Sequence, residues 1–317
     1  MTVAAVIAAQ RFGLGARPGD LALIGSDPRG WLQAQLGPEP APAAGPGRTA
    51  ERLKLFFDAR ASGDDEVIRL FRREYREAYV ADAGARTRRA AATDTPFRER
   101  LVHFWSNHFT VSAMRPVVAG LVVPFEDEAI RPHVAGRFAD LLLAVARHPA
   151  MLLYLDQAES IGPRSRAGQR NQRGLNENLA REVLELHTLG VDGGYGQADV
   201  RALAEMLTGW TIGNPRRGVI GEFLYVQAIH EPGPKTLLGR LRDEAGEREA
   251  AQALAELARH RSTARHVARK LARHFIADQP PDAVVARLAR VFLDSDGDLA
   301  AMMHAIVAEE QAWREPL

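Results

Sequence analysis

Apolar residues recur at the spacing of an α-helix through most of this 317-residue chain. Side chains three or four positions apart share one face of a helix, so this spacing predicts a largely helical protein. Only Gly218–His230 differs, because Phe223-Leu-Tyr-Val alternates weakly with polar neighbours and allows a short β-hairpin near 218–230. The expected fold class is all-α, with helices at 2–12, 28–36, 48–60, 64–90, 96–108, 124–133, 137–147, 149–157, 176–189, 197–209, 247–259, 262–276, 281–293 and 298–311.

One large multi-helix domain over 1–317 is the simplest organisation, since a chain of this length can bury an ample core and shows no repeat at solenoid spacing. Two segments interrupt the helical pattern. Residues 38–47 are rich in Pro, Ala and Gly, which predicts a linker between helices that is too short to separate two domains. Residues 161–174 carry four arginines among Gly, Ser and Gln, which predicts a basic loop. This loop either closes over an anionic ligand or is a solvated connection.

The composition excludes several classes of function. The 41 basic residues nearly balance the 40 acidic ones, so the net charge gives no support for nucleic-acid binding. The chain has no cysteine, which excludes disulfides, thiolate nucleophiles and cysteine-based metal sites. Its longest apolar run, Val117–Phe125, is too short to span a membrane. The first residues lack the basic region of a signal peptide, so a cytoplasmic protein is expected for the chain as given.

The helix expected at 176–189 has a polar face with an unusual number of reactive groups. Asn176 is placed to cap its start, and Gly190 stands where a left-handed residue ends many helices. The polar face is predicted to hold Glu177, Asn178, Arg181, Glu182, Glu185 and Thr188, and the apolar face Leu175, Leu179, Val183 and Leu186.

Two carboxylates on this polar face suggest chemistry. Glu182 and Glu185 lie about one turn apart, and two close carboxylates either share a proton or bind a cation. Carboxylates and amides favour Mg²⁺ or Ca²⁺, whereas added histidines favour a borderline metal. The candidate ligands of a divalent metal ion are Glu182, Glu185 and His108. Glu177 and Arg181 are spaced for an ion pair.

Two further segments carry histidines. In Leu101–Thr110, His108 or the His103/Asn107 pair either contributes to a shared pocket or is satisfied inside an aromatic-rich core. In Ile229–Gly239, two prolines and a glycine predict a stiff, exposed loop that presents His230, Glu231 and Lys235 together. That loop either holds an acid, a base and an anion-binding lysine, or is a simple turn.

Several motifs of the chain resemble one bacterial family. They are FWSNHF, GLNENLAREVLELHTLGVDGGY, ADVRALAEMLTGW, HEPGPKTLLG and ARKLARHF, and the similarity extends from RFGLGARPGD to the C-terminus. The chain resembles the "domain of unknown function 1800" family. The resemblance implies a largely helical fold, export of longer relatives to the periplasm, and genes often found beside those of alkaline-phosphatase- and sulfatase-like proteins. The chain departs from the family at Gly196, where Thr is usual, and at Glu231, where Asp is usual.

Two functions from different classes follow. The first is a metal-assisted hydrolase for an anionic substrate, in a cleft lined by Glu, His and Asn. Its catalytic residues would be Glu182, Glu185, His108 and His230, and its binding residues Asn107, Asn178, Arg181 and Lys235. The second is a non-catalytic helical scaffold, or a partner of a sulfatase- or phosphatase-like enzyme, with these charges in structural networks. The geometry distinguishes them, because catalysis needs the side chains to meet around an open cleft. The sequence does not indicate an oligomeric state.

Overall fold

The computed structural model describes residues 2–37, 48–171 and 174–314, so the predicted linker at 38–47 lies outside the described residues. Helices dominate the described chain, and the only strands there form two small antiparallel pairs. The predicted helical fold class is confirmed. None of the described helices is long and apolar enough to cross a lipid bilayer.

The predicted helices are present with small shifts at their ends. The α-helices are α1 (Val3–Ile7), α2 (Asp20–Ile24), α3 (Pro28–Gln33), α4 (Arg48–Ser62), α5 (Asp65–Ala92), α6 (Pro96–His108), α7 (Pro116–Ala119), α8 (Val122–Phe125), α9 (Phe138–Arg147), α10 (Pro149–Tyr154), α11 (Gly168–Asn171), α12 (Asn178–Glu182), α13 (Gln197–Leu207), α14 (Glu247–Ala258), α15 (Arg261–Phe275), α16 (Asp282–Asp294) and α17 (Leu299–Ala308). Single π-turns extend three of them, at η1 (Ala8–Phe12), η3 (Glu126–Ile130) and η6 (Val183–His187). Short 3₁₀ turns are η2 (Ala34–Leu36), η4 (Arg131–His133), η5 (Gln157–Glu159), η7 (Gln227–Ile229) and η8 (Glu310–Trp313). The three short helices α2, α7 and α11 were not predicted.

The strands lie between α13 and α14. Strand β1 (Trp210–Ile212) pairs with β2 (Phe223–Tyr225), so the expected strand character near 218–230 is present and its partner precedes that segment. Strand β3 (Lys235–Leu237) pairs with β4 (Arg240–Arg242) through a turn with positive φ at both central residues, Leu238 and Gly239. Three-residue strands are too short to give a period-2 pattern, and this second hairpin was not predicted.

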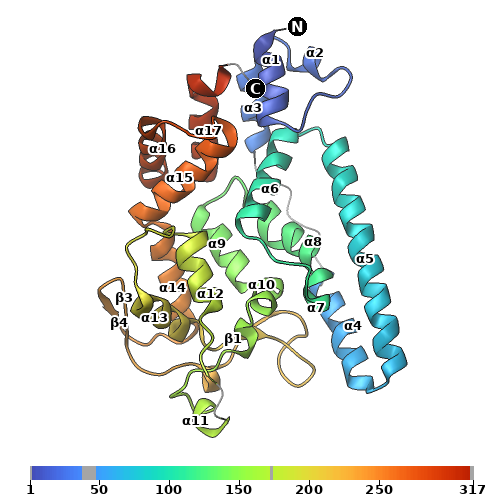
Figure 1. The fold of residues 1–317 in the computed structure, drawn as a ribbon, viewed down its shortest axis with the longest axis vertical. Coiled ribbons are helices and arrows are strands. Elements are labelled where there is room, and N and C mark those ends of the chain that lie inside the picture. Colours follow the sequence, from blue (N-terminus) through green and yellow to red (C-terminus); the bar gives the residue numbers. More distant parts are fainter. Residues whose placement is uncertain (1, 38–47, 172–173, 315–317) are drawn as a thin grey trace.

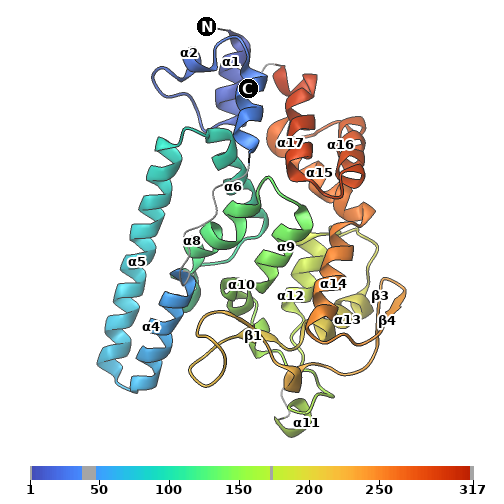
Figure 2. The same cartoon turned by 180° about the vertical axis from the view of Figure 1, so that it is seen from behind.

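The helices form a layered body with one long appendage. Helices α4 and α5 lie side by side along one edge of the molecule in both views (Figures 1 and 2). Helices α15, α16 and α17 pack together at one end, near α1 and α3 (Figure 1). Between these groups α9 packs against α14, and α12 against α13. The candidate residues of α12, α13 and the strands therefore lie in the middle and lower part of the body shown in Figure 1.

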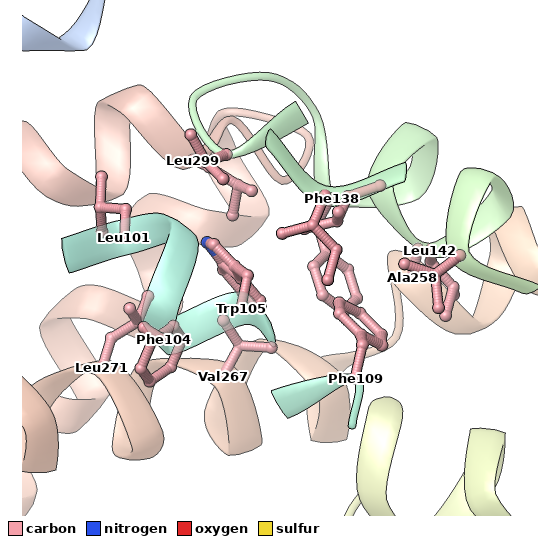
Figure 3. Close-up of a cluster of buried hydrophobic side chains, with 14 of the residues drawn as sticks. Leu101, Phe104, Trp105, Phe109, Phe138, Leu142, Ala258, Val267, Leu271 and Leu299 are labelled. Carbon is pink, nitrogen blue, oxygen red and sulfur yellow. The ribbon is translucent and has the colours of Figure 1, made fainter. Parts of the chain in front are cut away.

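Aromatic side chains join distant parts of the chain in the core. The ring of Trp105 lies 5.7 Å from that of Phe138 (Figure 3). The Phe138 ring in turn lies 5.7 Å from that of Phe292. A second cluster places Phe12 5.7 Å from Phe97 and 5.3 Å from Trp313. Because pairs of this geometry stabilise beyond their buried area, they hold η1, α6, α9, α16 and η8 together.

Candidate functional site

The helix with the reactive polar face is not one continuous α-helix. It begins at Asn178 in α12 and continues as the π-turn η6 over Val183–His187. The N-cap is Glu177, whose side chain makes no capping hydrogen bond, so the predicted cap at Asn176 is wrong. The Asn176 side chain instead accepts a hydrogen bond from the Asn178 amide at 2.8 Å, one residue before the cap. Gly190 has a φ of +84°, the left-handed value predicted there.

The π-turn corrects the predicted faces of this helix. A π-turn holds one residue more than an α-turn, so the side chains after it rotate away from their α-helical positions. Thr188, predicted on the polar face, is fully buried, and its hydroxyl donates to the Val183 carbonyl at 2.6 Å. Leu186, predicted on the apolar face, is 45% exposed.

Glu182 and Glu185 are half-buried and face solvent without a protein partner. No hydrogen bond or ion pair reaches either carboxylate from residues 2–37, 48–171 or 174–314. Burial, and then the negative charge of Glu185, raise the pKa of Glu182. Two neighbouring carboxylates in this state attract a cationic group.

The predicted ion pair of this helix is present. Arg181 lies 3.1 Å from Glu177, and the amide of Gln197 bridges the two at 2.9 and 2.8 Å. Arg181 therefore has its carboxylate partner within the protein. Asn178 is exposed on the same helix.

His108 is buried in a cluster of other groups. Its Nε2 donates to the His187 carbonyl at 3.1 Å, and its Nδ1 accepts from the Lys270 ammonium at 2.8 Å. Both ring nitrogens are thus engaged, and neither bond involves Glu182 or Glu185. Burial, and then the charge of Lys270, hold the pKa of His108 well below its usual value.

Two more histidines, His187 and His266, lie close to His108 and Lys270. The rings of His187 and His266 each lie 6.1 Å from that of His108, and His266 Nε2 donates to the Leu186 carbonyl at 3.1 Å. Burial and the charge of Lys270 lower the pKa of His187 to about 3. Lys270 and His266 were not predicted as site residues, because they lie on α15, respectively 162 residues after His108 and 80 after Leu186 in the sequence.

The loop that carries His230 is buried, which corrects the prediction of an exposed loop. His230 is 2% exposed, Glu231 1% and Lys235 3%. His230 Nδ1 donates to the Thr208 carbonyl at 2.8 Å, and its Nε2 lies 3.0 Å from the Glu249 carboxylate. The Lys235 ammonium lies 3.0 Å from the same oxygen of Glu249 and donates to the Glu231 carbonyl at 2.6 Å. A closed network therefore holds the loop.

The predicted basic loop joins this network. Arg164 donates its backbone amide and its Nε to the Glu231 carboxylate, at 2.8 and 2.5 Å. A Cβ at Gly162 would lie 2.6 Å from the Glu231 backbone, so glycine is needed for this close approach. The loop at 161–174 also contains α11, and its residues 172–173 lie outside the described residues. Through its two hydrogen bonds to Glu231, Arg164 therefore fixes the loop that carries His230 and Glu231.

The predicted residues do not assemble one centre. Asn107 is exposed on α6, His108 lies with Lys270, and His230 and Lys235 lie with Glu249. Across the part of the chain that the structure describes, no three His, Asp or Glu side chains are arranged to hold a metal ion. The candidate ligands Glu182, Glu185 and His108 therefore do not form such a group of three.

Removing one member of the buried network tests its role. In Lys235→Met, the buried carboxylate of Glu249 loses its contact with the Lys235 ammonium. The free energy of unfolding is therefore expected to fall by about 3–5 kcal/mol. The matched control is Lys54→Met, since Lys54 is exposed and pairs with Asp58 on the same helix. Its change stays within about 0.5 kcal/mol. Urea unfolding measures both, and equal effects would contradict a stabilising network.

The buried histidines predict a loss of stability in acid. Unfolded histidine takes up a proton near pH 6.5, whereas His187 in the folded protein stays neutral until a much lower pH. The contribution of His187 to the free energy of unfolding is therefore fully present above pH 6.5. At pH 5 the mismatch between the two pKa values lowers the free energy of unfolding by about 2 kcal/mol. His187→Gln should reduce the pH dependence of unfolding between pH 7 and 5 by that amount, whereas the exposed His304→Gln should not. An unchanged pH dependence in His187→Gln would refute this assignment.

The chain was compared with known proteins. A sequence model of one family, described as "Protein of unknown function (DUF1800)", matches residues 7–316. No curated protein and no solved structure gives a significant match. Because the match covers nearly the whole chain, this protein belongs to the DUF1800 family.

Proposed function

We propose that this chain is a non-catalytic helical protein that binds a partner protein through the face formed by Glu182, Glu185, Leu186 and Tyr195, here named the acidic face. One observation carries the proposal: Glu182 and Glu185 face solvent without a partner, whereas His108, His230 and Lys235 are bound in contacts elsewhere. A catalytic centre would need these groups around one cleft.

The charge of the acidic face favours a cationic partner surface. Burial and the neighbouring Glu185 raise the pKa of Glu182, so its charged form is destabilised in the free protein. An arginine or lysine from a partner would relieve this repulsion with a charge-assisted hydrogen bond. Arg181 does not supply this contact in the free protein, because it pairs with Glu177. The stabilisation of Glu182 therefore arises only in the complex.

Apolar groups beside the carboxylates support a protein partner over a small ion. Leu186 is 45% exposed and Val191, in the loop that follows, is 69% exposed. Tyr195 is half-buried, and the charge of Glu185 contributes to its raised pKa. Tyrosine and exposed aliphatic side chains next to charges are typical of protein interfaces.

The family resemblance suggests the class of partner. Genes of similar proteins are often found beside those of alkaline-phosphatase- and sulfatase-like proteins, so a protein of that class is the proposed partner. The alternative, a metal-assisted hydrolase, gains no support from the geometry, because its proposed ligands do not come together.

A binding titration tests the proposal. The purified protein is titrated with the sulfatase-like protein encoded nearest to its gene, using isothermal calorimetry. Binding is expected, and Glu182→Lys or Leu186→Asp should each weaken it at least about tenfold, equivalent to about 1.4 kcal/mol. The matched control is Glu77→Lys on α5, where Glu77 is exposed and distant in sequence. No binding, or equal weakening by Glu77→Lys, would reject the acidic face as the interface.

A further inference from the structure

One large cavity of the described chain is not lined by any of the predicted site residues. It has a volume of about 860 Å³ and lies where α1–η1, α6, the end of α15 and η8 meet. Phe275 lines it, and the Phe275 ring lies 5.9 Å from those of Phe12 and Phe97 in the aromatic core. This volume is typical of pockets for small organic ligands.

The walls of this cavity are rich in positive charge. Arg11, Arg100, Arg273 and Arg314 line it, and among the described lining residues Asp278 supplies the one carboxylate. Arg11 donates to the Ala312 carbonyl at 2.6 Å, so Arg100 and Arg273 are the candidate groups for an anion. Anion binding elsewhere was expected from Arg164 and Lys235, but these two are paired with Glu231 and Glu249. The cavity at the end of α15, where Arg100 and Arg273 have no described carboxylate partner, is therefore a better place for an anion than Arg164 or Lys235.

Arg100 is held in place without a carboxylate. Its Nη1 donates to the Gly13 carbonyl at 2.9 Å, and its Nε donates to His274 Nε2 at 3.2 Å. No described carboxylate forms an ion pair with it, and burial lowers its pKa. A half-buried guanidinium fixed by neutral groups keeps its charge for a ligand and loses little side-chain entropy on binding.

Arg273 adds a second charge at the same cavity. It is exposed at the C-terminal end of α15, and no described residue forms a hydrogen bond or an ion pair with it. Guanidinium groups form paired hydrogen bonds with the oxygens of phosphate and sulfate. Together Arg100 and Arg273 provide two cations for one oxyanion.

The remaining polar groups of this cavity are suited to a ligand that carries hydroxyl groups. Gln10, Gln279 and Gln311 line the same cavity with Asp278, and together they offer both donors and acceptors. A bare phosphate would leave most of the 860 Å³ volume empty. We propose that this cavity binds a sugar that carries a phosphate or sulfate ester, with the ester at Arg100 and Arg273 and the hydroxyls at the glutamines and Asp278.

Calorimetric titration of the full chain tests this site. The probes are glucose 6-phosphate, glucose 6-sulfate, glucose and inorganic phosphate. Saturable binding of one ester per chain is expected, with glucose and inorganic phosphate each at least about tenfold weaker, which corresponds to about 1.4 kcal/mol. The ester that binds more tightly identifies the anion. Failure of both esters to bind would overturn the proposal, and so would equal binding of glucose or inorganic phosphate.

A pair of variants locates the binding. Arg273→Gln should weaken ester binding at least about tenfold, because it removes one charge-assisted contact. Arg265→Gln is the matched control, since Arg265 is an exposed arginine on the same helix and does not line this cavity. Equal weakening by both variants would indicate a general charge effect and overturn the site, as would full binding by Arg273→Gln. The acidic face is not involved, so this test is independent of partner binding.

Discussion

The arrangement of the chain between α13 and α14 depends on one buried carboxylate, that of Glu249. Glu249 is 2% exposed, and one of its oxygens lies 3.0 Å from both His230 and Lys235. A buried charge is tolerated only with partners, so this oxygen fixes the loop that joins β2 to β3 against α14. The backbone of the same loop contacts Thr208 at the end of α13, and Glu231 adds Arg164. His230, Glu231 and Lys235, which the sequence suggested as an acid, a base and an anion-binding lysine, therefore stabilise the fold.

Helical periodicity predicted most of this fold because most helices bury one apolar stripe. The prediction fails where the backbone leaves the α-helical repeat. At η6 one additional residue per turn exchanges the environments of Leu186 and Thr188, and no residue type in the segment marks that change. Strands β1 to β4 have three residues each, so they depend on tertiary packing and leave no pattern of their own.

The candidate site was predictable only where contacts are local. Glu177 and Arg181 are four residues apart, and their ion pair follows from helix geometry. Arg164 and Glu231 are 67 residues apart, and His108 and Lys270 are 162 apart. The sequence identified Arg164, His108 and Glu231 as chemically unusual, but their partners are determined by packing. A reactive residue type therefore indicates a buried network as readily as a catalytic centre.

The proposed binding role is based on the contacts of the candidate residues. Glu182 and Glu185 are half-buried without a described partner, and His108 and His230 are bound elsewhere. The most direct measurement is elemental analysis of the purified, untagged protein beside Glu182→Gln and Glu185→Gln. The account predicts much less than one metal ion per chain in all three samples, with the variants fully folded. One metal ion per chain that is lost in both variants would contradict it.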